Sequence, residues 1–273
     1  MRDPIGVIAL LTDVGECEPY SASIKGVILS HCLNTHIVKI SNDIPSFDLK
    51  EAAYILLVSY KFFPPGTIFV VVVVPGVGIL ERSLLIVTKN YYFIGPDNGV
   101  LISAAKDDGI EKILLIDRDK CLLENNSQTF HGRDIYAPVA AKLSCDKSID
   151  EQGLPLDEEN VIGFDIEFTH HSTPEHVEIK VLHIDKYGNI ILSEYFDSFL
   201  VDFEFIKGVK VKICNGNEEA IAILEESFSY VPKGTLILYK NSYGLVELAV
   251  NQGSAQKLLK ANRGDIIRIH RFK

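Results

Sequence analysis

The chain has 273 residues, of which 47% are hydrophobic and 23% are charged. This composition is typical of a folded globular protein and excludes a wholly disordered one. A formal net charge of −10 argues against a nucleic-acid-binding protein, because tracking phosphates requires a basic face.

Membrane and disulfide signals are both weak in this sequence. No apolar run approaches the roughly 20 residues that a membrane helix needs, and the N-terminus lacks the basic region of a signal peptide. The five cysteines are odd in number, scattered and without a CxxC pair; they are Cys17, Cys32, Cys121, Cys145 and Cys214. We therefore expect a cytoplasmic protein with neither a disulfide framework nor a thiolate metal site.

The first half of the chain alternates predicted strands and helices. Strands are predicted at 6–11, 36–40 and 68–74, and helices at 20–32 and 49–60. This alternation is typical of right-handed crossovers that feed a mostly parallel, Rossmann-like sheet. The run 68–74 has no polar alternation, which predicts a central strand buried on both faces. Ligands of open α/β sheets bind beyond the carboxyl ends of such strands, here at Pro75-Gly76-Val77-Gly78.

The remaining elements form two groups. In the first group, a hairpin at 84–87 and 91–94, a helix at 100–105 and a strand at 113–116 precede a helix to about residue 145, with Asp134 as its cap. In the second group, short strands follow one another at 181–184, 190–192, 209–213, 234–239, 245–250 and 265–269, which predicts a small β-barrel or sandwich. We place the boundary near 169–174, which gives an N-terminal α/β domain at 1–168 and a smaller C-terminal β domain at 169–273.

Three residues of the first domain are candidates for chemistry. Asp13 follows a strand and precedes Gly15, so it could accept both hydroxyls of a ribose, although capping or turn formation is the better default. Phe47 could stack on a ligand, with a staple to the next helix as the default. His131 opens a helix within Phe130-His-Gly-Arg-Asp134; orienting a water and being a hydrogen-bonded surface histidine are equally supported.

In the second domain, Asp185-Lys-Tyr-Gly-Asn189 is typical of a tight hairpin turn. Glu247 and Asn251 interrupt a predicted strand with polar groups that need partners. His170 and His171 lack ligand-spaced carboxylates or cysteines, so no metal site is expected. The residues alone predict a two-domain protein that binds a small polar ligand.

Taken together, these stretches resemble one family, the S-adenosyl-L-methionine (SAM) hydroxide adenosyltransferases, or SAM hydrolases, whose relatives include the fluorinase and chlorinase. The similarity covers nearly the whole chain in the family's order. The matching segments are Thr12-Asp-Val-Gly15 with Tyr20 and Lys25-Gly26, Ile44-Pro45 with Phe47-Asp48, Phe62-Phe-Pro-Pro-Gly66, Pro75-Gly-Val-Gly78, Pro96-Asp-Asn-Gly99, Phe130-His-Gly-Arg-Asp134, Asp185 with Gly188-Asn189, and Asn241-Ser242 with Asn251.

The resemblance implies an N-terminal α/β domain, a C-terminal β-barrel, and a homotrimer whose sites lie between subunits. It implies SAM as the substrate, without a metal or another cofactor. Water or hydroxide would displace methionine from the ribose C5′ and leave adenosine. By position, the resemblance implies that Asp13 binds the ribose and that Phe47 stacks on the sugar. It implies that Asn189 and Asn251 bind adenine, with Tyr187 and Phe228 beside it. The methionine end would be held by Asp185, Ser242 and Glu18, and Glu247 also belongs to the binding set.

The sequence departs from the family pattern where the nucleophile is held. The hydrolases use an Asp, an Arg and a His, and here the Asp position is Val74 and the Arg position is Glu81. Arg82, next along the chain, is the candidate for the Arg role if the loop shifts by one position; the alternative is a plain surface residue. Only His131 is retained. Valine cannot accept a hydrogen bond from water, so we expect weaker positioning of the nucleophile.

Three readings follow from this departure. A SAM hydrolase, impaired or retuned by Val74 and Glu81, ranks first, and a non-catalytic protein that binds SAM or adenosine ranks second. A halide-dependent enzyme ranks third. An apolar residue at position 74 suits an anion, but the halogenase branch has an aromatic residue there and lacks the His-Gly pair.

Overall fold

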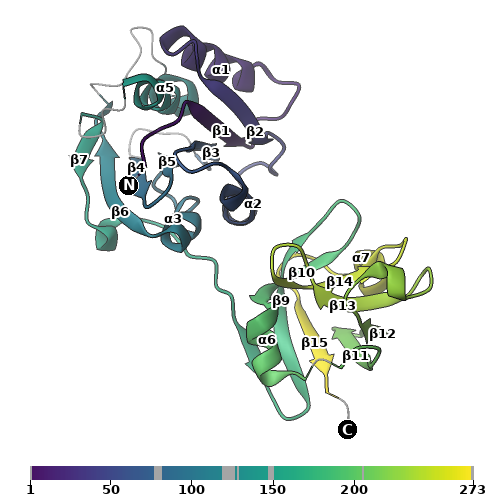
Figure 1. Ribbon diagram of the computed structural model, residues 1–273. Coiled ribbons are helices and arrows are strands. Elements are labelled where there is room, and N and C mark those ends of the chain that lie inside the picture. Colours follow the sequence, from purple (N-terminus) through teal and green to yellow (C-terminus); the bar gives the residue numbers. More distant parts are fainter. Residues whose placement is uncertain are drawn as a thin grey trace. The chain divides into compact units, whose positions relative to one another are not determined.

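The computed structural model describes residues 2–76, 82–118, 127, 129–146, 151–204 and 206–271. The chain divides into two compact units, Met1–Ile166 and Glu167–Lys273. Figure 1 shows the first unit as a sheet with helices and the second as a group of strongly curved strands.

The first unit is built on one sheet, which in the described residues has seven strands in the order β2-β1-β3-β5-β4-β6-β7. The strands are β1 (Val7–Thr12), β2 (His36–Ser41), β3 (Ile68–Val72), β4 (Ser83–Thr88), β5 (Tyr92–Pro96), β6 (Ile110–Ile116) and β7 (Gly153–Pro155). β2, β1, β3 and β5 are parallel, whereas β4, β6 and β7 pair antiparallel. The predicted α/β class is confirmed, and the predicted hairpin is the β4–β5 pair.

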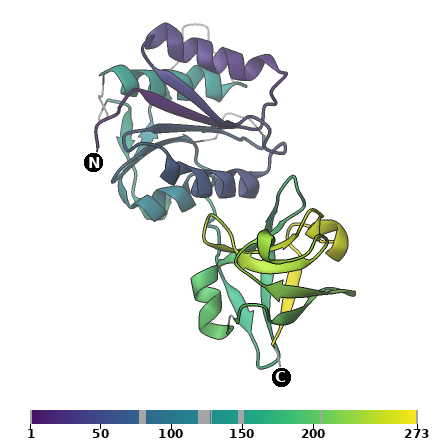
Figure 2. The ribbon, with the colours of Figure 1, turned by 45° about the vertical axis from the view of Figure 1, so that its right-hand side comes forward.

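Helices cover both faces of this sheet. They are α1 (Pro19–His31), α2 (Leu49–Ser59), α3 (Ile102–Asp108), α5 (Ala137–Asp146), the π-helical turn η2 (Gly132–Tyr136) and the 3₁₀ turns η1 (Tyr60–Phe62) and η3 (Glu158–Asn160). α1 and α5 lie on one face, and α2 and α3 lie on the other, in both Figure 1 and Figure 2. Buried Ile24 and Ile28 of α1 join Leu10, Val70 and Val139 in one core, so the α1–α5 face is held by apolar packing.

A disulfide joins the two helices on that face. Cys32, just after α1, is bonded to Cys145 near the end of α5, at a sequence separation of 113. The expectation of no disulfide was wrong for this pair. Sequence spacing could not reveal it, because only the packing of α1 against α5 brings the two thiols together. Cys17 and Cys214 are free thiols, and Cys121 lies outside the described residues.

The second unit is a closed β-barrel. Its described strands form one sheet in the order β10-β14-β13-β12-β11-β15-β9-β8, and β10 also pairs with β9, which closes the ring of seven and leaves β8 outside it. The strands are β8 (His170–Ser172), β9 (His176–Ile184), β10 (Ile190–Tyr195), β11 (Lys210–Asn215), β12 (Glu218–Leu224), β13 (Leu236–Lys240), β14 (Leu245–Val250) and β15 (Ile266–His270). The sequence predicted either a small β-barrel or a sandwich, and the pairing of β10 with β9 closes the sheet into a barrel.

Short helical segments interrupt the barrel strands. They are α6 (Phe196–Asp202), η4 (Phe228–Tyr230) and α7 (Ala255–Leu259). Phe196 and Phe199 of α6 are buried in the barrel core with Leu192 and Val246. The sequence analysis missed α6 and also β12, whose opening Glu218-Glu219 weakens the strand pattern. Across the described residues, no helix is both long and apolar enough to cross a membrane.

Candidate active site

The strand order of the first unit creates a switch point at β1. The chain leaves β1 through α1 to β2 on one side, and returns through α2 to β3 on the other side of β1. Ligands of open α/β sheets bind at such a point, outside the carboxyl ends of the strands. Asp13 follows β1 there, and its N–H donates to the carbonyl of Val72 at the end of β3, 3.4 Å away.

Asp13 holds the loop that precedes α2. Its Oδ2 accepts a hydrogen bond from the backbone N–H of Phe47 at 2.9 Å. Phe47 has a φ of +67°, a left-handed conformation that is strained for a bulky L residue. Its side chain is 62% exposed, so it is not part of the core. Asp48 rather than Asp13 caps α2, through a bond from the Glu51 N–H.

A chain of buried polar side chains begins at Thr12, the residue before Asp13. The hydroxyl of Thr12 donates to Asn42 Oδ1 at 3.2 Å, and the amide of Asn42 donates to the Ser21 hydroxyl at 2.9 Å. All three residues are buried. Satisfied buried polar groups fix geometry, so this chain of bonds ties the end of β1 to α1 and to the loop after β2. The sequence analysis missed Asn42 and Ser21, which carry no local signal of a long-range bond.

Val74 lies two residues beyond β3 and is 8% exposed. The carbonyl of its neighbour Val73 accepts a bond from Asn98 Nδ2 at 3.0 Å, which connects the ends of β3 and β5. Residues 77–81, which include Glu81, lie outside the described residues.

Arg82 is held by an acidic side chain and a backbone carbonyl. Its guanidinium forms an ion pair with the buried Asp97 and donates to the carbonyl of Asn160 at 2.5 Å. Burial raises the pKa of Asp97, and Arg82 acts against that rise. The Asp97 carboxylate also accepts a bond from the Ile162 N–H, so these contacts tie the segment after η3 to the sheet.

The residue after His131 packs against the end of β3. This residue, Gly132, has no room for a side chain, because an added Cβ would stand 2.7 Å from Val72 Cγ1. His131 is only 5% exposed, which rules out the surface-histidine reading. The π-helical turn η2 that follows is a form often found at functional sites.

The imidazole of His131 contacts Arg118. The Arg118 Nη2 atom lies 2.6 Å from Nε2 and 3.2 Å from Nδ1 of His131. Burial and the Arg118 charge lower the pKa of His131, and Asp134 opposes them. The imidazole is therefore neutral near pH 7. The sequence analysis did not single out Arg118, which stands 13 residues from His131.

Asp134 is not the cap that the sequence predicted. It is buried inside η2, accepts two bonds from Arg133 at 2.6 and 2.9 Å, and accepts a third from the Ser127 N–H. The Arg133 guanidinium also lies 5.2 Å from the centre of the Phe130 ring, which packs edge-on against Tyr20. These contacts brace the segment that presents His131.

In the second unit, Asp185 organises the turn between β9 and β10. Its Oδ1 accepts bonds from the N–H groups of Tyr187 and Asn189, and its Oδ2 accepts from the Asn189 side chain, each at 2.9 Å. The hairpin prediction is confirmed. Tyr187 is 65% exposed at the tip, with the Lys186 ammonium 4.9 Å from its ring centre.

Glu247 has the partners that its place in a strand requires. It is 6% exposed, accepts from the Tyr239 hydroxyl, and accepts from Asn241 Nδ2 at 3.0 Å. Burial raises the pKa of Glu247, partly offset by these two bonds, and the nearby Asp185 charge adds to the rise. The pKa of Glu247, in the β13–β14 pair, therefore depends on the charge of Asp185 in the β9–β10 turn.

The other predicted residues of this unit lie on adjoining loops. The Phe228 ring packs against Tyr239 at 5.4 Å, and Asn251 Nδ2 donates to the carbonyls of Phe228 and Val231. Ser242 is exposed in the turn after Asn241. Back in the first unit, Glu18 is exposed at the N-cap of α1, where its side chain makes no capping bond.

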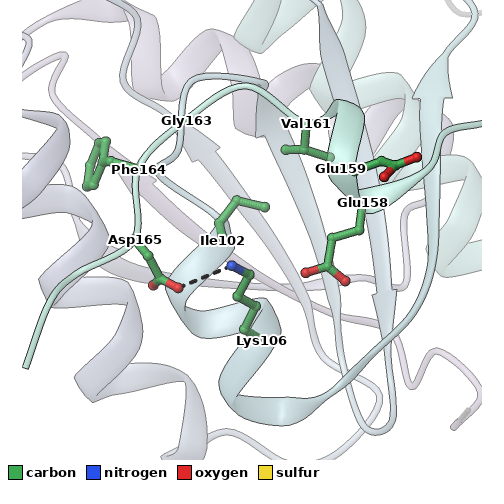
Figure 3. Close-up of a pocket in the computed structure, with 8 residues that line it drawn as sticks. All are labelled: Ile102, Lys106, Glu158, Glu159, Val161, Gly163, Phe164 and Asp165. Atoms are coloured by element: carbon green, nitrogen blue, oxygen red, sulfur yellow. Dashed lines mark hydrogen bonds and ion pairs between the residues drawn. The ribbon is translucent and has the colours of Figure 1, made fainter.

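A separate cavity of about 410 Å³ lies between α3 and the segment after η3 (Figure 3). Its lining is Ile102, Lys106, Glu158, Glu159, Val161, Gly163, Phe164 and Asp165, which includes none of the predicted site residues. Figure 3 shows the Lys106–Asp165 ion pair that crosses one side of it. Because it lacks the strand-end residues, we place the chemistry at β1 and β3 instead.

No group of three or more His, Cys, Asp or Glu side chains in the described segments is arranged to hold a metal ion. The strand-end groups are a carboxylate, an exposed aromatic ring and a neutral imidazole beside a guanidinium. They can bind a polar ligand and orient a small nucleophile.

Comparison with known sequences identifies the family. The SAM hydroxide adenosyltransferase N-terminal domain matches residues 8–153, and the C-terminal domain of the same family matches residues 179–268. The chain belongs to the SAM hydroxide adenosyltransferase family. Both matches fall within the two units that the structure separates.

Individual relatives of this family span the whole chain. A protein of Methanocaldococcus jannaschii named (R)-S-adenosyl-L-methionine hydrolase is 35% identical over 277 residues, 98% of each chain. A Thermus thermophilus protein of the same name is 29% identical over 269 residues, covering 96% of this chain and 98% of its own. The crystal structure of an uncharacterized conserved protein from Thermotoga maritima has a TM-score of 0.90 at 33% identity, covering 97% of this chain and all of that one.

Proposed function

We propose that the protein is a SAM hydrolase, which converts SAM and water into adenosine, L-methionine and a proton. The observation that carries the proposal is that Val72, at the end of β3, joins two candidate groups: its side chain packs against Gly132, next to the buried His131, and its carbonyl accepts from the N–H of Asp13, which holds Phe47. Relatives of full length that are named (R)-S-adenosyl-L-methionine hydrolase support it.

Binding roles follow from the chemistry of each group. Asp13 accepts the ribose hydroxyls, because a carboxylate has lone pairs beyond the one that Phe47 uses. Phe47 offers an exposed ring that stacks on the sugar.

Barrel residues, together with Glu18 of the first unit, bind the two ends of SAM. Asn189 and the backbone at Asn251 hydrogen-bond adenine, with Tyr187 and Phe228 flanking its faces. Asp185, Ser242, Glu18 and Glu247 form the polar set for the methionine end. Asp185 already accepts three bonds, and a carboxylate has about four acceptor sites, so one ammonium N–H still fits.

The reaction is a displacement at the ribose C5′. The oxygen–carbon bond forms as the carbon–sulfur bond breaks, and the bonding pair leaves on sulfur as the neutral thioether of methionine. Because a sulfonium is already a good leaving group, the protein needs mainly to align the nucleophile and exclude other water. The reaction requires no metal or other cofactor, so EDTA should not slow it.

Val74 favours one alternative, a protein that binds SAM or adenosine without turnover. Incubation of the purified protein with SAM, followed by chromatography, separates the two. Adenosine and methionine in equal amounts support the hydrolase, with SAM alone as the control for spontaneous breakdown. Binding in a calorimeter without any adenosine would establish the non-catalytic reading.

We also propose that the enzyme is a cytoplasmic homotrimer, with residues of both domain types completing each site. Exposed aromatic rings in each unit, Phe47 and Tyr187, support shared sites because a ligand or a neighbouring subunit would cover them. Light scattering should give about three times the chain mass of 30.4 kDa. A monomer that binds SAM tightly would contradict the shared site. Cell fractionation tests the location.

A further inference from the structure

Arg118 is a basic residue that the fold brings to the His131 ring. It follows the end of β6 (Ile110–Ile116), and the fold brings its guanidinium within 2.6 Å of the His131 ring. Arg82, the basic residue nearest to the family position, is instead held by Asp97 and Asn160. In the described residues, Arg118 is therefore the cationic side chain that contacts the His131 ring.

The contact with Arg118 determines which ring nitrogen of His131 carries the proton. A guanidinium can only donate hydrogen bonds, so the nitrogen that accepts from it carries no proton. Taking the shorter contact, to Nε2, the proton of the neutral ring resides on Nδ1. His131 then presents an N–H donor and cannot serve as the base that removes a proton from water.

Two donors and one positive charge suit a small oxyanion. The charge comes from Arg118, and the second donor is His131. Donors of this kind, aimed at a negative oxygen in a site closed to water, stabilise it strongly.

We propose that Arg118 is a catalytic residue which, together with His131, holds the attacking hydroxide of this enzyme. The proposal rests on the proposed SAM hydrolysis. A bound water loses its proton to solvent, the hydroxide oxygen bonds to C5′, and the C5′–S pair leaves on sulfur. The anion and the sulfonium are both neutralised in this step, and no carboxylate at position 74 is required.

The pH dependence of activity follows from the groups that act on His131. Besides burial, these are Arg118 from the segment after β6 and Asp134 from η2, while β3 presents the apolar Val72. Replacing Arg118 by Gln removes a charge that lowers the pKa of His131, so that pKa rises. Loss of the cation also raises the pKa of the bound water, and this second change moves the acid limb of kcat to higher pH, because an imidazolium donates a hydrogen bond as the neutral ring does.

The test compares Arg118→Gln, Arg118→Lys and the wild-type enzyme from pH 5 to pH 10. We expect Arg118→Gln to lose about 10²-fold in kcat at pH 7 with little change in KM, and Arg118→Lys to keep part of the rate. Arg268→Gln, which removes a barrel arginine paired with Glu178, is the matched control and should leave both constants unchanged.

Nuclear magnetic resonance titration of the histidines provides a readout that does not depend on turnover. The His131 pKa should be higher in Arg118→Gln than in the wild type, while His270 in the barrel stays unchanged. A variant with the wild-type rate, pH profile and His131 pKa would overturn the role of Arg118 and leave SAM hydrolysis standing. A wild-type enzyme that forms no adenosine at any pH would overturn both proposals.

Discussion

The Asp13 carboxylate accepts a hydrogen bond from the Phe47 N–H at 2.9 Å, across 34 residues of sequence. This bond links the end of β1 to a loop whose strained φ of +67° turns the Phe47 ring toward solvent. Strain of this kind persists only where neighbouring contacts enforce it, and it concentrates at binding sites. Asp13 therefore holds this loop, and binding the ribose is the second role that we propose for it.

Replacing Asp13 by Ala should abolish most adenosine affinity, by at least about tenfold, because both the ribose acceptor and the Phe47 anchor are lost. Calorimetry with adenosine measures the loss. Asp43→Ala is the matched control, since Asp43 is an exposed carboxylate of the neighbouring loop. Equal affinities in the Asp13 variant and the wild type would show that the ribose lies elsewhere.

The backbone of Phe47 can be tested apart from its ring. Phe47→Gly and Phe47→Ala both remove the stacking surface, so both should weaken adenosine binding. Only Gly adopts a positive φ without cost, so Phe47→Gly should be about 1 kcal/mol more stable than Phe47→Ala. Urea unfolding compares them. A less stable Gly variant would mean that the loop does not hold this conformation in solution.

Val74→Asp should raise the rate of SAM hydrolysis, because a carboxylate would accept a hydrogen bond from the nucleophile and orient it. A positioning group is worth roughly 10²–10⁴-fold, which sets the upper limit. Val74 is 8% exposed, so burial would raise the pKa of the new carboxyl and the gain should grow with pH. The rate of SAM consumption measures it.

Glu81 provides a second arm to that experiment. Glu81→Arg should help more in the Val74→Asp background than alone, and a double-mutant cycle reads the coupling. A fast wild-type rate that Val74→Asp leaves unchanged would show that the nucleophile needs no acceptor at position 74.

The Cys32–Cys145 bond should contribute to stability. In the chain-entropy account, closing a loop of roughly 100 residues is worth up to about 4–5 kcal/mol. Guanidinium unfolding of Cys145→Ser, compared with the oxidised wild type, should show a lower midpoint. Cys17→Ser removes an exposed free thiol and serves as the control. If reductant leaves the wild-type midpoint unchanged, the bond does not form in the purified protein.

Much of the fold could be predicted because its signals are local. The apolar run from Ile68 onward predicts a central strand, and β3 has β1 and β5 on its two sides. The polar turn from Asp185 to Asn189 predicts the hairpin that Asp185 holds. In both cases neighbouring residues decide the conformation, so the sequence pattern is sufficient.

The remaining features depend on contacts across the fold. Arg118 meets His131 only because the fold brings the segment after β6 to the start of η2, and Cys32 meets Cys145 only because α1 packs on α5. Asp134 resembled a cap by position, but its buried pairing with Arg133 places it inside the helical segment. Residue type and spacing do not encode such partners, so the chemistry around His131 could not be assigned from sequence alone.

The most direct test of SAM hydrolysis is to run the reaction in ¹⁸O-labelled water and to analyse the products by mass spectrometry. Displacement at C5′ predicts adenosine that carries one ¹⁸O at its 5′ oxygen and methionine that carries none. Unlabelled adenosine, label in methionine, or the absence of adenosine above the level of SAM alone would contradict the account.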